Sequence, residues 1–299
     1  MTKIKFRKNS KIVNTVSKIL LLFFLLSFGT VKNLSAQFGG GDGLSEATAF
    51  QIWSKAHLDE LRDSVNNGNN YSDTYFVVLD NIAEPITKPI GIFSYSALSR
   101  KTFQGVFDGN NKTIVLDLDY NLSAFGVGLF AAIENAIVKN VVVAGNVRGG
   151  TFVAGICAMA YTSLILNCIN ASTVVGNIAV AGILGADSVS TISNSINIGS
   201  IVSENGDCAG ILACGSYGRS KILNCINYGY IRTISDDVPS WAGTGGIIGH
   251  HENSNIISNC ANFGVVEGPE GLTGQISGTT VRRNITNCHY DKQMCGEED

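Results

Sequence analysis

The sequence predicts an all-β fold, a parallel β-solenoid with a short capping helix on its N-terminal side. Short β-branched and apolar segments recur with a period near 27 residues between positions 128 and 290. Apolar residues alternate with a period of two inside each segment, which indicates strands rather than helices. Gly (34) and Asn (28) are abundant while Pro (4) is scarce, which is typical of many similar turns. The 299 residues therefore predict one elongated unit, although length alone suggests two domains.

Residues 1–36 have the pattern of a secretory signal peptide. Six Lys and Arg precede the apolar run ILLLFFLLSF, and Leu34-Ser35-Ala36 offers a small residue at the cleavage site. The apolar run is shorter than the roughly 20 residues that a transmembrane helix needs, and no later apolar segment is long enough to span a membrane. Residues 1–36 hold seven of the 21 basic residues and no acid, so the remaining chain has 14 basic and 24 acidic residues, or −10. This charge disfavours nucleic acid and anionic membranes as partners. We predict a secreted, periplasmic or cell-surface protein.

The segment after the signal peptide predicts a cap and the first strands. Ser54 is a suitable N-cap, and Leu58, Leu61 and Val65 form one apolar face of a helix. We expect this helix to cover the end of the solenoid, where unpaired strand edges invite aggregation. The chain then divides into a signal peptide (1–36), a cap region (37–104) with a helix near 54–66, a β-helix (105–290) and a polar tail (291–299).

Two columns of residues mark the repeat. A Gly opens segments such as GILG, and 12 to 14 residues later an Asn precedes Cys or Ser in segments such as KILNCINYG. The glycines are Gly128, Gly155, Gly182, Gly210, Gly246 and Gly274, and the asparagines are Asn140, Asn167, Asn194, Asn224, Asn259 and Asn287. We expect the glycines to adopt positive φ at tight corners and the Asn amides to hydrogen-bond to one another and to turn backbone. The alternative is that the Asn column lines a binding face. Six copies predict six repeat coils.

These motifs resemble the GLUG-motif repeats of bacterial exported proteins. Phe103–Ile114 (FQGVFDGNNKTI) resembles the segment that commonly opens such arrays, and Gly39–Gly68 resembles the leading segment of the same proteins, which are frequent in the Bacteroidetes. The resemblance covers nearly all of the chain after residue 36. It implies a single-stranded, right-handed, pectate-lyase-like β-helix at the cell surface or outside the cell. It implies no single activity, because GLUG repeats accompany adhesins and immunoglobulin A peptidases.

The eight Cys are expected to be mainly buried thiols. Four of them share one repeat column in which Ser195 also stands: Cys168, Cys225, Cys260 and Cys288. Stacked coils give parallel Cβ vectors, which suit a disulfide poorly, so the thiols act as small hydrophobic groups; a bridge between Cys288 and Cys295 is the alternative. His250-His251 has no H-E-x-x-H context and no C-x-x-C pair occurs, so we predict no metal site and no cofactor.

A polysaccharide lyase or glycoside hydrolase of the same fold is the enzymatic alternative. Lyase chemistry needs a basic residue near carboxylates that hold Ca²⁺ against uronate groups, so Ca²⁺ is expected only under this alternative. Equivalent turns of different coils hold Arg219, Arg282 and Arg283. The same row of turns along the solenoid holds Asp187 and Glu252. Fold analogy alone assigns no function, and the nucleophile-elbow, phosphate-loop and dinucleotide motifs are absent. We predict no catalytic residues.

An insertion at Ser235–Gly245 interrupts the period, and solenoid insertions often lie on the binding face. The side chains expected to bind a sugar there and in neighbouring turns are Asp236, Asp237, Trp241, Tyr161, Tyr217 and Arg219. The alternative for Trp241 is that it covers apolar surface at the coil edge. We therefore predict a non-enzymatic surface module for binding or adhesion, with a glycan or a host or bacterial surface protein as partner. A spacer without a ligand is the third possibility.

Overall fold

The computed structural model describes residues 38–96, 99–215, 219–251, 254–279 and 284–292. The predicted signal peptide, Tyr217, Glu252, Arg282, Arg283 and Cys295 lie outside these residues. Within them, no helix has both the length and the apolar character needed to cross a membrane.

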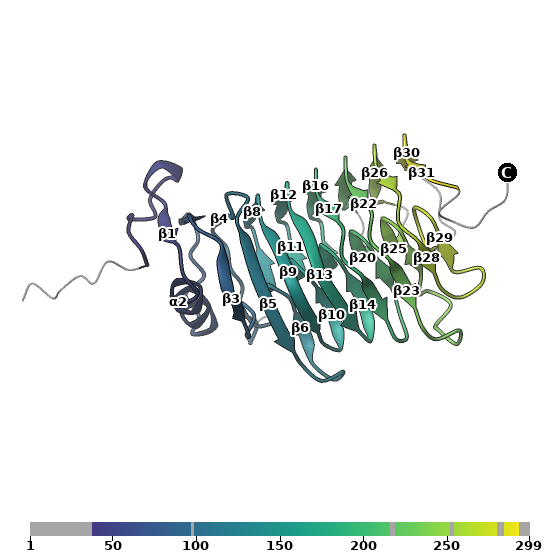
Figure 1. The fold of residues 1–299 in the computed structure, drawn as a ribbon, viewed down its shortest axis with the longest axis horizontal. Coiled ribbons are helices and arrows are strands. Elements are labelled where there is room, and N and C mark those ends of the chain that lie inside the picture. Colours follow the sequence, from purple (N-terminus) through teal and green to yellow (C-terminus); the bar gives the residue numbers. More distant parts are fainter. Residues whose placement is uncertain (1–37, 97–98, 216–218, 252–253, 280–283, 293–299) are drawn as a thin grey trace, which may run out of the picture. The chain divides into compact units, whose positions relative to one another are not determined.

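Residues from Phe38 onward form a right-handed parallel β-solenoid, which confirms the predicted fold class (Figure 1). Every pair of named strands is parallel, and each strand pairs with the equivalent strand of the next coil. The sheet that runs along the whole array has nine strands and therefore about eight turns. It contains β1 (Phe50–Ile52), β2 (Tyr75–Val78), β4 (Val106–Asp108), β8 (Ile137–Lys139), β12 (Leu164–Leu166), β16 (Thr191–Ser193), β21 (Lys221–Leu223), β26 (Ile256–Ser258) and β30 (Ile285–Thr286). The array thus begins before the six copies of the repeat.

Three further sheets complete the coils. The eleven-stranded sheet contains β3 (Ile82–Ile86), β5 (Thr113–Asp119), β9 (Val142–Arg148), β13 (Ile169–Gly176), β17 (Ile196–Asn197), β18 (Ile201–Ser203), β22 (Ile226–Asn227), β23 (Ile231–Thr233), β27 (Ala261–Asn262), β28 (Val266–Glu267) and β31 (His289–Tyr290). The five-stranded sheet contains β7 (Phe130–Glu134), β11 (Cys157–Tyr161), β15 (Leu184–Ser188), β20 (Leu212–Gly215) and β25 (Ile248–His251). The six-stranded sheet contains β6 (Phe125–Val127), β10 (Thr151–Ala154), β14 (Ile178–Ala181), β19 (Cys208–Ala209), β24 (Thr244–Gly245) and β29 (Thr273–Gly274).

The core is a set of inward columns. In the nine-stranded sheet, one register position is aliphatic or aromatic on seven successive coils: Phe107, Val138, Ile165, Ile192, Ile222, Ile257 and Ile285. The first six of these are at most 1% exposed. Alternate residues along each strand point inward, so a period of two in the sequence becomes a continuous apolar stack along the solenoid axis.

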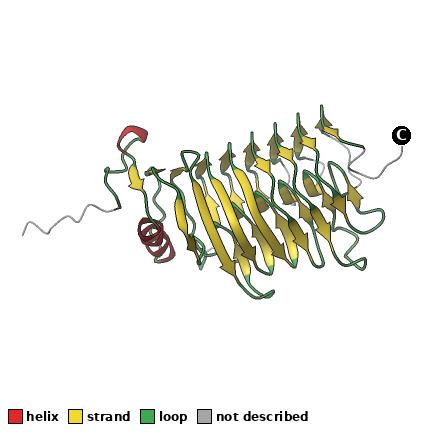
Figure 2. Ribbon diagram, in the orientation of Figure 1, coloured by secondary structure: helices red, strands yellow, loops and turns green. Residues whose placement is uncertain are grey.

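The predicted helix is present as α2 (Lys55–Asn66), which follows a short 3₁₀ turn, η1 (Glu46–Thr48), and strand β1 along the chain (Figure 2). Ser54 is its N-cap and its Oγ accepts a hydrogen bond from the backbone N–H of His57. Leu58, Leu61 and Val65 are buried and join the core cluster that continues through the coils. The helix therefore adds its apolar face to the core of the first coils, as a cap requires.

The second Asn of each repeat forms a buried ladder that the sequence analysis did not single out. We call Asn170, Asn197, Asn227 and Asn262 the inner Asn ladder; each is 0% exposed. Each Nδ2 donates to the Oδ1 of the next coil at 2.7–2.8 Å, and Gln275 Oε1 ends the series at 2.8 Å. Each amide also bonds backbone two residues on, for example Asn197 Nδ2 to the carbonyl of Gly199 at 3.0 Å. The ladder thus satisfies the buried polar groups of one corner.

The predicted reason for the glycine column is wrong. None of its six members is among the glycines with positive φ. The role of four of them is steric, because the inner Asn ladder fills the space that a side chain would need: a Cβ on Gly210 would lie 2.5 Å from Asn227 Oδ1 and 2.5 Å from the carbonyl of Gly246. Gly155, Gly182 and Gly246 face the ladder in the same way.

The left-handed corner belongs instead to the predicted Asn column. Asn140, Asn167, Asn194, Asn224, Asn259 and Asn287 have φ between 51° and 55°, a conformation that Asn tolerates better than most residues. Side-chain bonds of 3.2 Å join Asn167 to Asn140, Asn259 to Asn224 and Asn287 to Asn259. The expectation that these amides bond to one another is therefore met at these three steps.

The last member of the glycine column is also corrected. The register places Gly274 opposite Gly245, one residue before the column. A Cβ on Gly246 would meet the carbonyl of Gln275, as a Cβ on Gly155, Gly182 or Gly210 would meet the carbonyl of the next column glycine. Gln275 therefore occupies the column position in the last coil and uses its side chain to end the inner Asn ladder.

The described Cys residues are free thiols. Cys168, Cys225 and Cys260 are buried, and each Sγ contacts the carbonyl two residues earlier at 3.3–3.4 Å. Ser195 Oγ donates to the equivalent carbonyl at 3.1 Å, which explains why Ser replaces Cys there. Burial raises the pKa of the Cys168 thiol to about 12. These thiols therefore serve packing, in agreement with the sequence-based expectation.

Candidate functional site

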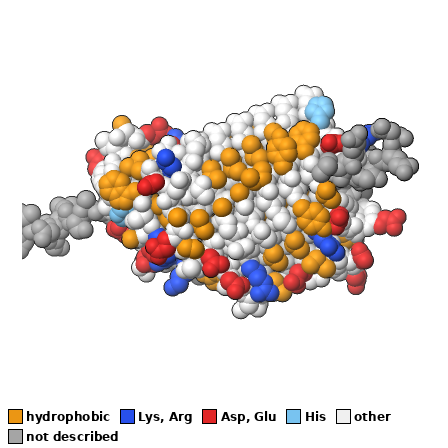
Figure 3. Space-filling model, viewed as in Figure 1, with side chains coloured by type: hydrophobic (Ala, Val, Ile, Leu, Met, Phe, Trp, Pro, Cys, Tyr) orange, Lys and Arg blue, Asp and Glu red, His pale blue; other side chains and the backbone are white. Residues whose placement is uncertain are grey.

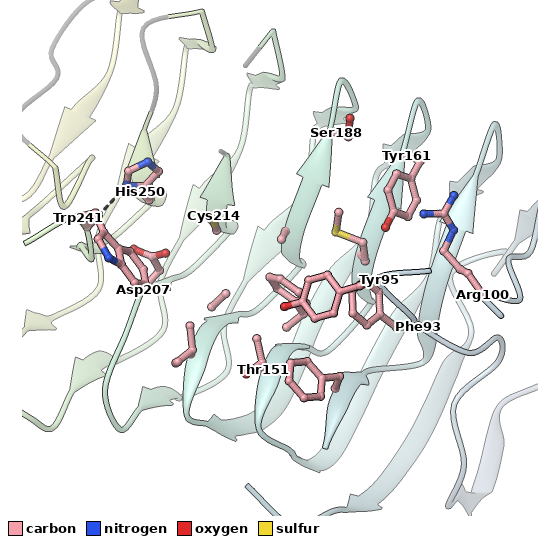
Figure 4. Close-up of a pocket in the computed structure, with 16 residues that line it drawn as sticks. Phe93, Tyr95, Arg100, Thr151, Tyr161, Ser188, Asp207, Cys214, Trp241 and His250 are labelled. Carbon is pink, nitrogen blue, oxygen red and sulfur yellow. Dashed lines mark hydrogen bonds between the residues drawn. The ribbon is translucent and has the colours of Figure 1, made fainter. Parts of the chain in front are cut away.

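A groove of about 930 Å³ crosses the face formed by the five-stranded and six-stranded sheets (Figure 4). It spans five successive coils, or about 19 Å at the usual strand spacing. Its lining residues are Phe93, Tyr95, Arg100, Phe125, Thr151, Phe152, Met159, Tyr161, Ile178, Ala179, Ala186, Ser188, Asp207, Cys214, Trp241 and His250. The volume is in the range of ligand sites, and aromatic side chains with a few polar groups form the usual lining of such sites.

Two register positions form the floor. On the five-stranded sheet, residues Met159, Ala186, Cys214 and His250 stack in that order. On the six-stranded sheet, the position that precedes the paired residues Val153, Val180 and Cys208 is occupied by Gly126, Phe152, Ala179, Asp207 and Gly243 on successive coils. We call this second position the groove column. Its side chain changes from coil to coil, so each coil presents different chemistry to the groove.

The groove column breaks strand regularity. Gly126, Phe152 and Ala179 have φ of 72°, 57° and 56°. Left-handed backbone is rare for a bulky residue such as Phe and costs of order 1–2 kcal/mol. Such outliers cluster at ligand sites, where the surrounding structure maintains them. Here the conformation interrupts the strand pairing at Phe152 and at Ala179, and Phe152 joins the aromatic lining of the groove.

One end of the groove is an aromatic cluster. A hairpin held by reciprocal backbone bonds between Ile92 and Lys101 carries Phe93 and Tyr95. The Phe93 ring contacts the rings of Tyr95, Phe125 and Phe152 at centroid distances of 5.1–6.5 Å. Tyr95 is 72% exposed and Phe125 is 49% exposed. These rings therefore offer apolar faces to a ligand in the groove.

Arg100 borders this cluster. Its guanidinium carbon lies 3.8 Å from the centroid of the Tyr161 ring, within the range of a cation–π contact. One guanidinium nitrogen lies 3.6 Å from Glu134 Oε2, a long ion pair for which little stabilisation is expected at the surface. Arg100 therefore packs against the Tyr161 ring at this end of the groove, with the Glu134 carboxylate near its charge.

The other end is built by the predicted insertion. Trp241 is 48% exposed, and its backbone carbonyl lies 2.6 Å from Nδ1 of His250. Two residues later, the N–H of Gly243 donates to Oδ1 of Asp207 at 2.8 Å. The insertion is thus attached to the floor by one contact to His250 and one to Asp207.

Asp207 is the buried charge of the groove, with no exposed surface. Burial raises the pKa of Asp207 to about 7, against the opposing effects of the Gly243 N–H, the charge of His250 and the Cys214 thiol. Apart from that weakly donating thiol, Oδ2 has no hydrogen-bond partner among the described residues. Within the described ranges, no three His, Cys, Asp or Glu side chains are placed to hold a metal ion.

The structure unites only part of the predicted site. Trp241 and Tyr161 both line the groove although they lie on different coils. Asp236 and Asp237 are exposed on the insertion and are not among the lining residues. Arg219 is exposed, with φ of 70°, and also lies outside the lining.

The line of charges expected for a lyase is corrected at Asp187. This residue is 1% exposed, so it does not lie on a solvent turn. It accepts hydrogen bonds from Ser220 Oγ and from the backbone N–H of Ser190, and burial raises its pKa to about 6. Asp187 therefore braces a corner and is not paired with the exposed Arg219.

The sequence analysis did not single out most groove residues, including Phe93, Tyr95, Phe152 and Asp207, and it considered His250 only as a metal ligand. They have no counterpart in neighbouring repeats, whereas self-comparison finds residues that repeat. The available signal was the aligned position before Val153, Val180 and Cys208, where the residue type changes at every coil.

Among the comparisons with known proteins, only the one with solved structures finds a match, and it concerns the fold. No family model matches the chain, and no curated protein matches it. Among solved structures, the chain is similar to a Bacteroides ovatus protein designated a "putative immunoglobulin A1 protease", at 20% identity and a TM-score of 0.65. The similarity covers 85% of this chain and 78% of that one. At this identity the likeness shows the shared solenoid fold alone.

Proposed function

We propose that this chain is an exported, non-enzymatic binding module whose groove holds a glycan of a host or bacterial surface. The observation that carries the proposal is the aromatic lining of a groove that crosses five coils. Rings at both ends are exposed, with Tyr95 and Phe125 at one and Trp241 at the other. The signal-like residues 1–36 and the GLUG-type motifs support export.

A glycan fits this groove better than an extended peptide. Peptides bind sheets mainly by adding a strand to a free edge. The floor strands have no free edge, because β10, β11, β14, β15, β19 and β20 each pair with a strand on both sides. The floor therefore offers side chains and ring faces rather than backbone. Sugar rings can stack on aromatic faces and use their hydroxyls to bond the polar groups between them.

The test is glycan binding by the chain without residues 1–36, first on a glycan array and then by calorimetry with the array hits. We expect saturable binding that weakens at least tenfold in Trp241→Ala and in Tyr95→Ala, because each removes an exposed ring from the groove. The matched control is Tyr228→Ala. Tyr228 is 53% exposed and its ring stacks on that of Phe263. Both residues lie beside the eleven-stranded sheet. Figure 3 shows exposed hydrophobic side chains following one another across this face.

Four outcomes would contradict the proposal. Binding that survives both groove variants would place the site elsewhere, and binding lost only in Tyr228→Ala would move it to the eleven-stranded sheet. Turnover of uronate polymers in the presence of Ca²⁺, lost on Arg219→Ala, would replace binding by the lyase alternative. Absence of binding to any glycan would favour the spacer.

A further inference from the structure

Asp207 leaves a buried carboxylate oxygen unsatisfied at the Trp241 end of the groove. Oδ1 accepts the Gly243 N–H at 2.8 Å, whereas Oδ2 has no hydrogen-bond partner among the described residues. The Cys214 thiol, a weak donor, also interacts with this carboxyl group. A buried polar atom without a full partner costs about 1–3 kcal/mol, and more when the group is charged. Such an atom in the wall of a ligand site is a position at which a ligand can supply the missing donor.

The surroundings of Asp207 favour a cationic donor over a neutral one. Figure 4 shows the side chains of Asp207, Trp241 and His250 together at one end of the groove. The ionisable groups that face Asp207 are His250 on the next coil and the thiols of Cys214 and Cys208. No Lys or Arg lines this end of the groove within the described residues. An ammonium group there gains from a carboxylate and from the face of an indole ring.

We propose that the Asp207–Trp241 end of the groove is a subsite for a protonated primary amine, so that the preferred glycan carries an unacetylated amino sugar. The inference rests on the proposed glycan-binding function and specifies its ligand. The amine donates to Oδ2 of Asp207 and lies against the Trp241 ring. The neighbouring sugar rings extend over Ala179 and Ala186 toward the aromatic cluster.

Access to the subsite requires a local movement. Asp207 has no exposed surface in the unliganded chain, so a neighbouring side chain must shift to admit the amine. Trp241 is the side chain expected to move, because it is half exposed and lies on the insertion. Its fluorescence reports this movement in a Trp53→Phe background, since the chain contains only two Trp.

The test compares three β-1,4-linked oligosaccharides of equal length that differ only at carbon 2, which carries an amine, an acetamide or a hydroxyl group. We expect the amine form to bind about tenfold tighter than the other two, as for a hydrogen bond between charged groups. Asp207→Asn should remove this preference, because Asn keeps an acceptor for Gly243 but lacks the charge. Asp187→Asn is the control, since it changes another buried Asp outside the groove and should keep the preference.

A second readout does not depend on Asp207→Asn folding normally. Carboxyl ¹³C NMR of the wild-type chain should show the pKa of Asp207 shifting downward on addition of the amine form and unchanged with the acetamide form. Equal binding of all three probes, a preference that survives Asp207→Asn, or an unshifted Asp207 pKa would overturn the inference. In the first two cases binding that still requires Trp241 and Tyr95 leaves the proposed function intact. A chain that binds no glycan on the array fails the proposed function itself.

Discussion

The inner Asn ladder and the groove column are both stacks of one residue per coil, but they differ in how much the side chain varies. The ladder repeats Asn on four coils, and every amide bonds to the next coil and to its own turn. The groove column presents no side chain, a phenyl ring, a methyl group and a carboxylate on successive coils.

This difference separates the two tasks of the solenoid. A repeated residue bonds to copies of itself, so the ladder stabilises the stack and offers nothing new along its length. A position whose residue type varies from coil to coil cannot bond to copies of itself. The groove column accordingly contains backbone strain at Phe152 and a partly unsatisfied carboxylate at Asp207. Regions that bind ligands commonly accept such costs because the rest of the fold offsets them.

The largest expected effect comes from breaking the ladder at its centre. Asn197→Ala removes one hydrogen-bond partner from the side chain of Asn170, one from the side chain of Asn227, and the side-chain partner of the Gly199 backbone. We expect the free energy of unfolding to fall by about 3–5 kcal/mol, measured by urea denaturation, while the folded protein keeps its groove. Asn205→Ala is the control, since it breaks an exposed Asn–Asn bond and should change stability by about 0.5 kcal/mol or less. Equal effects of the two variants would show that the ladder is not a special source of stability.

A second prediction concerns the cost of the carboxylate in the groove column. The pKa of Asp207 is raised by burial to about 7, above its unfolded value of about 4, so the folded chain binds the proton more tightly. Its contribution to stability is therefore fully present below pH about 4 and is lost as the pH rises through about 7, on the order of 4 kcal/mol in total. Denaturation between pH 4 and pH 8 should show a decline that is smaller in Asp207→Asn. An unchanged decline in the variant would mean that Asp207 is not the group responsible.

The same contrast explains what the sequence could predict. Residues that repeat carry their own signal, so the two columns, the period near 27 and the solenoid follow from self-comparison. The reason for a repeated residue is harder to predict. A Gly that recurs in each repeat fits either a left-handed corner or a site with no room for a side chain. Only the structure, in which Asn197 and its equivalents occupy that room, shows that the second reason applies. The one-residue shift at Gly274 was hidden because Gln275 replaces Gly in the last coil.

The candidate site was less predictable for the opposite reason. Trp241 was found because its insertion interrupts the period, which is a signal in itself. Phe152 and Asp207 leave the period of the sequence intact, since they occupy a regular position whose residue type is free to vary. Their role depends on left-handed backbone and on burial, which one sequence without structure does not reveal.

The smallest expected effect tests whether the two stacks obey different packing rules within one coil. Gly182→Ala adds a methyl group against the inner Asn ladder, where it would meet the Asn197 side chain and the carbonyl of Gly210, and should cost about 1–3 kcal/mol. Ala179→Gly removes a methyl group three residues earlier, in the groove column, where φ is 56°. Relief of about 1–2 kcal/mol of strain is offset by the entropy of Gly and the lost burial, so stability should stay within about 1 kcal/mol of the wild type. The measurement is urea denaturation of both variants in parallel. If Ala179→Gly destabilised the chain as much as Gly182→Ala does, the groove column would be as tightly constrained by packing as the ladder, and its variability would need another explanation.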